Sequence, residues 1–339
     1  MACKKVLIIH TGGTIGMKKT DNGYAPVAGF LREALEGIPD LKKAGMPSWE
    51  LLELPSILDS SNVGVREWNE IAKMIYDSYG DYDGYVILHG TDTMAYTASA
   101  LSFILENNDK PIILTGSQIP LCELRSDGVD NIVTSLIIAA EGVVREICLF
   151  FGSRLLRGNR ATKMSADGLR AFDSPNYPHL ADVGISIRYN RSAIAKPLGK
   201  KIKYNPFSDV PIGVIKVFPG VQFALFEPIM TDKLSGIVLE GFGTGNIPDR
   251  KGELLPIVKR AFDAGVVVVV CSQCPQGAVS LGAYETSTPL KRAGAISGSD
   301  MTTEAAVAKL YHLRSSNVPD EQIQSFMLRN ISGELTENV

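Results

Sequence analysis

The stretch Thr11-Gly12-Gly13-Thr14-Ile15-Gly16 directly follows Val6-Leu7-Ile8-Ile9, a run of apolar residues that favour strands. A second threonine-rich stretch, His89-Gly90-Thr91-Asp92-Thr93, follows the similar run Tyr85-Val86-Ile87-Leu88. This pattern predicts two turns at the carboxyl ends of two strands, which is where open α/β sheets bind their ligands. A threonine hydroxyl there, close to a carboxylate and a lysine, is a candidate attacking group. Our leading hypothesis is therefore covalent catalysis by threonine.

The rest of the first half alternates strand-like and helix-like segments. Apolar residues at helical spacing predict a helix over residues 94–107, with Thr91 or Asp92 suited to cap its amino end, and a second helix that opens at Ser126. Strands are predicted over residues 111–115 and 146–151. The alternation predicts an α/β fold whose larger N-terminal sheet is mostly parallel and flanked by helices.

The length of the chain, 339 residues, exceeds the size at which one hydrophobic core usually stops growing, which favours two domains. Residues 191–211 contain Lys, Pro, Gly and Asn without sustained periodicity, so we expect a linker there. Before it we expect a catalytic α/β domain, residues 1–190. Strand and helix patterns resume after it, which predicts a smaller C-terminal α/β domain over residues 212–339.

Composition argues against several kinds of partner. The formal net charge of -3 gives no basic excess for a phosphate backbone, so we expect no nucleic-acid partner. No apolar run approaches the roughly 20 residues that cross a bilayer, and the amino terminus reads as a strand, so we expect a cytoplasmic protein without membrane contact. The five cysteines, Cys3 among them, fit reduced thiols. Cys271 and Cys274 have the spacing of half a zinc site, but no second pair exists and we expect no metal.

The glycines of the first turn have two possible uses. Gly12, Gly13 and Gly16 permit positive φ and close backbone approach, and free amides in such a turn can hold a developing oxyanion. The alternative is a dinucleotide-binding loop, because Thr11-x-Gly13-x-x-Gly16 resembles that fingerprint without its first glycine. The acidic residue that such a loop needs about 20 positions onward is missing, which favours the first use.

An attacking threonine requires a base. The four histidines of the chain do not favour that role, whereas a lysine can act as a base when burial or neighbouring charge lowers its pKa. Lys163 comes after the strand that ends at Phe151, so it is a candidate for the same sheet edge. The residues alone leave the choice among the lysines open.

Several separated motifs resemble one family. Taken together and in order, they are similar to the bacterial-type L-asparaginases, and to the cytoplasmic type I group over nearly the whole chain. The motifs are Thr11 to Gly16, residues 22–26, Asp59-Ser60-Ser61, His89 to Phe103, Thr115 to Pro120, Arg125 to Gly128 and the segment that ends at Lys163.

The resemblance implies a double-displacement amidase. Thr14 would attack the side-chain carboxamide carbon of asparagine, ammonia would leave, and water would resolve the aspartyl ester. Thr91, Asp92 and Lys163 match the family's second catalytic group, which relays protons. Tyr24 matches the tyrosine of a mobile lid that excludes water.

The resemblance also implies how the substrate is bound. Asp59 and Ser60 match residues that hold the α-carboxylate and α-amino group, with Thr91 beside them and Asp92 as an ammonium partner. Asn246 matches an asparagine that a neighbouring subunit contributes, which implies a homotetramer built from intimate dimers. No metal or organic cofactor is expected.

An effector site is one point of departure from the family. Some type I members bind a second asparagine, and the matching residues here are Thr162, Glu240 and Cys274. Glu240 stands where those members use an arginine, and a carboxylate should repel the effector's α-carboxylate. We expect weak or altered cooperativity.

Two other functions remain as alternatives. The ammonia-supplying subunit of a tRNA amidotransferase shares the threonine turns, although such subunits carry an extra N-terminal domain and the first strand here begins near Val6. A dinucleotide-binding protein is the other alternative. Within the leading hypothesis, glutamine is the obvious second substrate, because one methylene is worth only about 1 to 3 kcal/mol of discrimination.

Overall fold

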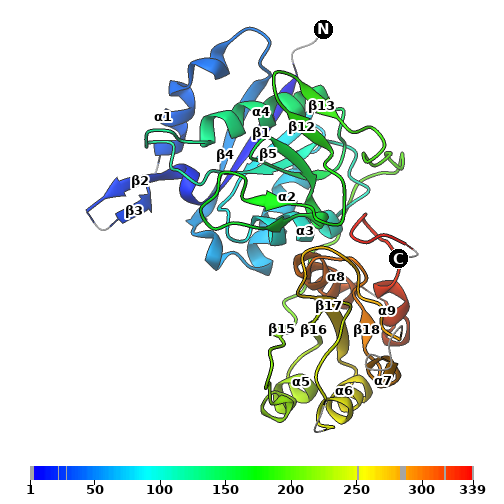
Figure 1. Ribbon diagram of the computed structural model, residues 1–339. Coiled ribbons are helices and arrows are strands. Elements are labelled where there is room, and N and C mark those ends of the chain that lie inside the picture. Colours follow the sequence, from blue (N-terminus) through cyan, green and yellow to red (C-terminus); the bar gives the residue numbers. More distant parts are fainter. Residues whose placement is uncertain are drawn as a thin grey trace. The chain divides into compact units, whose positions relative to one another are not determined.

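The computed structural model describes residues 4–21, 23–27, 29–249, 252–282, 288–316 and 318–337. The chain divides into two compact units, Met1–Tyr204 and Asn205–Val339, which are treated separately below (Figure 1). The division falls inside the segment 191–211 that we expect to be a linker. Cys3 and Asn22, which belong to the sequence patterns above, lie outside the described residues.

The N-terminal unit is built on one large sheet. Its strands are β1 (Lys5–Gly12), β4 (Ser48–Leu58), β5 (Gly84–Leu88), β7 (Ile112–Thr115), β8 (Ile147–Phe151), β9 (Arg154–Arg157), β12 (Ala181–Val183) and β13 (Ile187–Tyr189). They follow the order β13-β12-β9-β8-β7-β5-β1-β4. The run β4-β1-β5-β7-β8 is parallel and the pairs from β8 to β13 are antiparallel, so the predicted mostly parallel sheet is confirmed.

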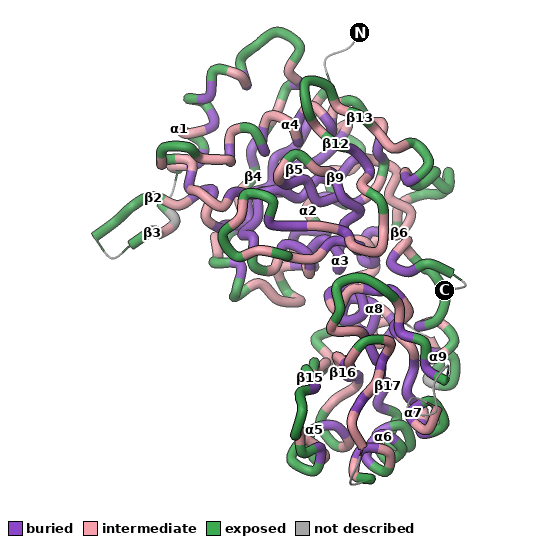
Figure 2. Tube along the Cα trace, in the orientation of Figure 1, coloured by how far each residue is buried: buried purple, intermediate pink, exposed green. Residues whose placement is uncertain are grey.

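Helices cover both faces of this sheet (Figure 1). On one face α1 (Phe30–Gly37) and α4 (Gly128–Glu141) pack Leu35 and Leu136 against Val6, Ile8 and Val86. The other face is covered by α2 (Val65–Asp77) and α3 (Met94–Ile104). The central strands are fully buried (Figure 2), and each buried Ile or Leu contributes about 1.5 to 3 kcal/mol relative to an exposed one. The sheet is therefore a rigid base for the loops at its edge.

Short elements complete the N-terminal unit. A hairpin of β2 (Met17–Thr20) and β3 (Gly23–Pro26) follows the first turn and extends away from the large sheet (Figure 1). A second small pair joins β10 (Thr162–Lys163) to β11 (Phe172–Asp173). The single turns of 3-10 helix are η1 (Thr14–Gly16), η2 (Pro39–Lys42), η3 (Ser60–Asn62) and η4 (Gly158–Arg160).

Two local predictions about α3 are wrong. The helix ends at Ile104 rather than Asn107, because β6 (Leu105–Glu106) pairs with β14 (Lys203–Tyr204), a strand inside the segment predicted to be linker. The residue at the amino end of the helix is Thr93, and no side chain caps it. Thr91 and Asp92 are therefore not used as caps, and their side chains have other partners.

The C-terminal unit is the smaller α/β domain that the sequence predicts. Its elements are β15 (Ile212–Lys216), η5 (Phe223–Leu225), α5 (Glu227–Asp232), β16 (Gly236–Gly241), α6 (Leu254–Asp263), β17 (Val267–Ser272), α7 (Thr288–Arg292), β18 (Ile296–Ser297), α8 (Thr303–Ser315) and α9 (Asp320–Met327). The sheet has the parallel order β15-β16-β17-β18. The buried residues Ile237, Leu239 and Val268 pack with α5 and α6, while Leu310 of α8 packs over Gly236.

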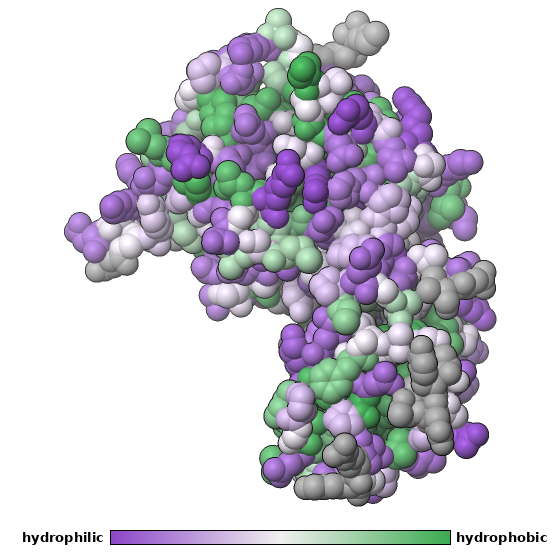
Figure 3. All heavy atoms as spheres, viewed as in Figure 1, coloured by the Kyte–Doolittle hydropathy of each residue, from purple (hydrophilic) through white to green (hydrophobic). Residues whose placement is uncertain are grey.

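Among the described residues, neither the surface nor the cysteines indicate a membrane span or a metal site. Hydrophobic side chains are interspersed with hydrophilic ones on the face of each unit seen in Figure 3. No helix among the described residues has the length and apolar character needed to span a membrane. Cys122, Cys148, Cys271 and Cys274 are free, and the described part of the chain holds no cluster of three metal-ligating side chains.

Candidate active site

Three loops at the carboxyl edge of the N-terminal sheet are in direct contact, because glycines occupy the points where they meet. A Cβ on Gly13 would lie 2.3 Å from the Cα of Gly90, and a Cβ on Gly90 would lie 2.5 Å from the Ser60 hydroxyl. A Cβ on Gly12 would lie 2.0 Å from the carbonyl oxygen of Leu58. No side chain fits at these distances, and Gly12 and Gly13 also have positive φ, of 121° and 84°. The loops after β1, β4 and β5 therefore form one site.

Thr14 is the first residue of η1, directly after this glycine contact. Its side chain is half-buried. Among the described residues, neither its hydroxyl nor its amide has a hydrogen-bond partner, and the amide of Thr91 has none either. The two touching loops thus present a hydroxyl and two N–H donors that no described residue uses.

The structure brings together Thr91, Asp92 and Lys163. The ammonium of Lys163 donates to the Thr91 hydroxyl at 2.9 Å and to the Asp92 carboxylate at 2.6 Å. Thr91 is buried, whereas the side chain of Asp92 is 67% exposed and that of Lys163 is 20% exposed. The group is therefore buried at Thr91 and open to solvent at Asp92.

The position of Lys163 depends on the small β10–β11 pair. Thr162 pairs with Asp173 across it, so the backbone beside Lys163 is fixed by the neighbouring strand. The Asp173 carboxylate is in turn bound by Arg154 and by His179, each at 3.0 Å. These contacts lower the pKa of Asp173 although burial raises it, so this carboxylate stays charged and keeps its partners.

Gln118 is a site residue to which the sequence patterns gave no role. The Thr91 hydroxyl donates to its amide oxygen at 3.2 Å, while its amide nitrogen donates to the carbonyls of Ala166 and Gly168, both at 3.2 Å. Its backbone N–H donates to the carboxylate of Asp127. Because the amide is held in this orientation, the Thr91 proton points at Gln118 and a lone pair faces Lys163. In the sequence, Gln118 follows a strand at the same sheet edge and lies in the motif Thr115 to Pro120, but neither observation assigned it a role.

Asp59 and Ser60 lie at the same junction of loops. The exposed Asp59 carboxylate accepts from the backbone N–H of Ser61 at 2.9 Å and from its hydroxyl at 2.7 Å, and these bonds lower the pKa of Asp59. Ser60 is buried, and its carbonyl accepts from the Thr93 hydroxyl at 2.7 Å. A charged carboxylate is thus held beside the Gly13–Gly90 contact.

Tyr24 lies on β3 of the hairpin and is 47% exposed. Its hydroxyl donates to the Glu123 carboxylate at 2.9 Å, and this bond raises the pKa of Tyr24. The hydrogen bond joins Tyr24 to the loop after β7 and not to Thr14, Thr91 or Lys163. Like Gln118, Glu123 is a residue near the site, and the sequence patterns gave it no role.

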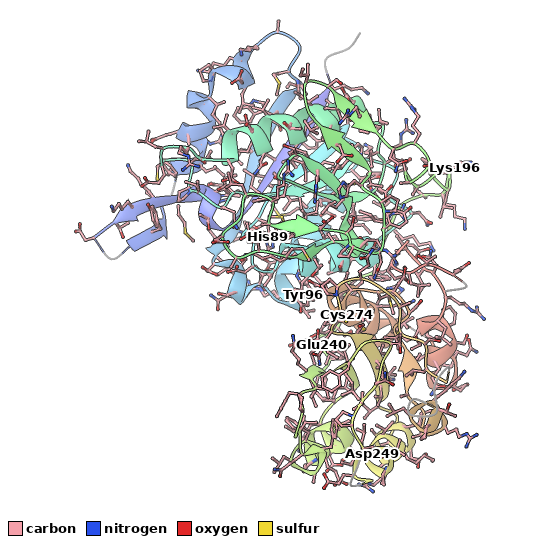
Figure 4. All side chains as sticks on the ribbon, viewed as in Figure 1. His89, Tyr96, Lys196, Glu240, Asp249 and Cys274 are labelled. Atoms are coloured by element: carbon pink, nitrogen blue, oxygen red, sulfur yellow. The ribbon has the colours of Figure 1, made fainter. Side chains whose placement is uncertain are left out.

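The remaining predicted residues belong to different units. Thr162 is in the N-terminal unit, whereas Asn246 is in the C-terminal unit. Glu240 and Cys274 are also in the C-terminal unit (Figure 4). Asn246 closes a tight turn by bridging to Phe242. The Glu240 carboxylate accepts from the Thr303 hydroxyl at 2.6 Å.

Known proteins match this chain in sequence and fold. The asparaginase N-terminal domain family matches residues 5–195, and the glutaminase/asparaginase C-terminal domain family matches residues 211–327. The chain belongs to the asparaginase family, so the resemblance seen in the sequence is confirmed.

Individual relatives cover the whole chain. L-asparaginase 1 of Escherichia coli is 44% identical over 336 residues, which are 99% of this chain and 99% of that protein. The crystal structure of L-asparaginase I from Vibrio cholerae superposes with a TM-score of 0.91 at 45% identity, and covers 99% of this chain and 100% of that one. A glutamyl-tRNA(Gln) amidotransferase polypeptide of Pyrococcus abyssi is 31% identical, over 98% of this chain and 77% of that protein.

Proposed function

We propose that this chain is an L-asparaginase that hydrolyses L-asparagine to L-aspartate and ammonia through a threonine ester. The observation that carries the proposal is the hydrogen-bonded group of Lys163, Thr91 and Asp92, in which Thr91 and Asp92 belong to the loop that touches the turn of Thr14. Membership of the asparaginase family over both domains supports the same reaction.

In the first half of the reaction, the Thr14 oxygen forms a bond to the carboxamide carbon of the substrate. The oxyanion that develops is stabilised by the amides of Thr14 and Thr91, which have no acceptor among the described residues. The proton of Thr14 passes through the group of Thr91 and Lys163 to the leaving nitrogen. The carbon–nitrogen bond breaks, ammonia leaves, and an aspartyl ester remains on Thr14.

In the second half, water attacks the ester carbon. Its proton passes to the Thr14 oxygen as the ester bond breaks, so Thr14 is restored and aspartate leaves. Lys163 takes part in both proton transfers, because its N–H groups point at the Thr91 hydroxyl and at Asp92. Between the proton transfers, the fixed Gln118 amide directs the Thr91 lone pair at Lys163.

The charged end of the substrate belongs on the open side of this group. Asp59, Ser60 and Asp92 bind the α-amino and α-carboxylate groups, and Tyr24 covers the site from its hairpin. The partner subunit's Asn246 completes the site, which requires a homotetramer of two dimers. The reaction as proposed takes place in the cytoplasm and uses no metal or cofactor.

The rival function has weaker support. The tRNA amidotransferase polypeptide is 31% identical to this chain, against 44% for an L-asparaginase of matching length. If the glycine turn bound a dinucleotide, the hydrogen-bonded group of Lys163, Thr91 and Asp92 would have no function in the protein. At the effector position, Glu240 is already hydrogen-bonded to Thr303, and we propose that asparagine does not activate the enzyme there.

The test measures ammonia release from asparagine and from glutamine, separately and across concentration, without tRNA. We expect turnover of asparagine with a hyperbolic saturation curve and a lower rate with glutamine. Thr14→Ala should lower kcat on the order of 10³-fold or more while aspartate binding and Tm are retained, and Thr14→Ser should keep part of the activity because it keeps the attacking oxygen.

Two outcomes would contradict the proposal. Absence of ammonia release by the wild-type protein would remove the function, and substantial turnover by Thr14→Ala would remove the nucleophile. A strongly sigmoidal curve that Glu240→Ala abolishes would contradict the effector argument alone.

A further inference from the structure

His89 is a buried titratable residue that the proposed reaction does not use. It lies between β5 and the Thr91 loop, with no exposed surface, inside the N-terminal unit (Figure 4). Its Nδ1 lies 2.8 Å from the carbonyl oxygen of Gly90 and its Nε2 lies 2.9 Å from the Thr97 hydroxyl. Both ring nitrogens are therefore engaged, one of them with the backbone of the candidate site.

The direction of these hydrogen bonds follows from the Gly90 carbonyl, and the bond from Trp68 to Thr97 is compatible with it. An indole N–H can only donate, and that of Trp68 donates to the Thr97 hydroxyl at 3.1 Å. Because the Gly90 carbonyl can only accept, Nδ1 of His89 carries the proton of the neutral ring, and Nε2 accepts from the Thr97 hydroxyl. His89 therefore donates to the Gly90 carbonyl.

Burial keeps the imidazole neutral. Desolvation lowers the pKa of His89 to about 4, although the bond to Gly90 opposes the shift. The tautomer is thus determined by the Gly90 carbonyl and does not change around neutral pH. The chain from Trp68 to Gly90 is one ordered set of donors and acceptors.

The Gly90 carbonyl and the Thr91 N–H belong to the same peptide group. In a trans peptide these two groups point in opposite directions, so a carbonyl held toward the buried imidazole turns the Thr91 N–H away from it. No described residue accepts from that N–H. The same peptide follows the Cα of Gly90, which is in contact with Gly13.

We propose that His89 is a positioning residue for the reaction: its Nδ1–H holds the Gly90–Thr91 peptide so that the Thr91 N–H remains available to the oxyanion. This inference rests on the proposed function. In this inference, His89 does not touch the substrate. It aligns the Thr91 N–H, one of the two donors that stabilise the oxyanion in the transition state.

The first test reads the tautomer in the wild-type protein by nitrogen NMR of isotope-labelled histidine. The signal of His89 is assigned by its loss in His89→Asn. We expect a neutral ring protonated on Nδ1, unchanged between about pH 5 and pH 8. A ring protonated on Nε2, or one that titrates in this interval, would overturn the inference.

The second test uses a matched pair of variants. In His89→Asn the side-chain amide nitrogen takes the place of Nδ1 and keeps the donor to Gly90, whereas in His89→Gln the amide takes the place of Nε2 and keeps only the partner of Thr97. We expect kcat of His89→Gln to fall roughly ten- to a hundredfold with little change in KM or in aspartate Kd, because the lost alignment acts in the transition state. His89→Asn should lose at least about fivefold less.

Stability measurements separate alignment from folding. Both variants replace a buried ring, so Tm should fall by similar amounts in the two. Equal losses of kcat in both variants, or a loss that follows Tm, would overturn the inference. Wild-type protein that has the expected tautomer but releases no ammonia would instead overturn the proposed function.

Discussion

Lys163 and Lys309 each form an ion pair with a carboxylate, in different units and with different surroundings. Lys309 of α8 lies 2.7 Å from Glu334, and neither side chain has exposed surface. Its three N–H donors are all used, by Glu334, by the Met327 carbonyl at 2.9 Å and by the Arg329 carbonyl at 2.5 Å. Among the described residues Lys163 has two acceptors, and its carboxylate partner is 67% exposed.

This difference indicates that the Lys309–Glu334 pair stabilises the fold, whereas the Lys163–Asp92 pair is available for proton transfer. The Glu334 carboxylate also accepts from the backbone N–H groups of Ile331 and Ser332, so both partners of the buried pair are saturated. A saturated ammonium cannot move a proton without breaking the fold around it. Lys163 keeps one donor unused by the described residues and faces water through Asp92, which is what a proton relay requires.

The largest expected effect is that of Lys163→Met. It should lower kcat by roughly 10³- to 10⁴-fold, the upper part of the range for a group that moves protons, while Tm changes by only about 2 °C. Ammonia release and thermal unfolding measure the two quantities on the same preparation. If the variant kept more than a tenth of the wild-type kcat, Lys163 would have a structural role, like Lys309, and would not be required for proton transfer.

Lys309→Met is the matched change in the other unit. It leaves the Glu334 carboxylate buried without its cation, which should lower the free energy of unfolding by about 3 to 5 kcal/mol. Denaturant unfolding measures this loss. Below the transition, kcat per folded molecule should stay within about twofold of the wild type, because no proton passes through Lys309 in the proposed reaction.

Removing both charges sharpens the same comparison. Burial lowers the pKa of Lys309 even though Glu334 raises it, so desolvation outweighs what the pair recovers. The double variant Lys309→Met with Glu334→Leu should therefore be more stable than Lys309→Met alone. A double variant less stable than the single one would show that the bonds of Glu334 to Ile331 and Ser332 outweigh the cost of burying its unpaired charge.

The sequence predicted the framework of the site because that framework is local. A strand followed by a threonine-rich turn can be read from neighbouring residues, and parallel strands bring such turns to one edge. The resemblance then singled out Lys163, whose contacts to Thr91 and Asp92 span 72 and 71 residues. No local pattern carries information over that distance.

The errors have the same origin. Thr91 and Asp92 have the composition of a helix cap, yet distant partners take their side chains. The end of α3 at Ile104 is determined by β14, which comes from the other end of the unit. Gln118 gains its role only when the loops after β5 and β7 lie beside each other, and His89 only when α3 places Thr97 beside its ring.

The smallest expected effect is that of Gln118→Met, which changes the surroundings of Thr91 without touching Lys163. The variant keeps the length of the side chain and removes the acceptor of the Thr91 hydroxyl, together with the two bonds to Ala166 and Gly168. One hydrogen bond is worth about 0.5 to 1.5 kcal/mol, so kcat should fall roughly two- to twelvefold. The pH dependence of kcat should move with it, because the Thr91 proton is then free to turn toward Lys163. An unchanged kcat and pH profile would mean that Lys163 alone orients Thr91. The loop after β7 would then contribute nothing to the arrangement of Lys163, Thr91 and Asp92.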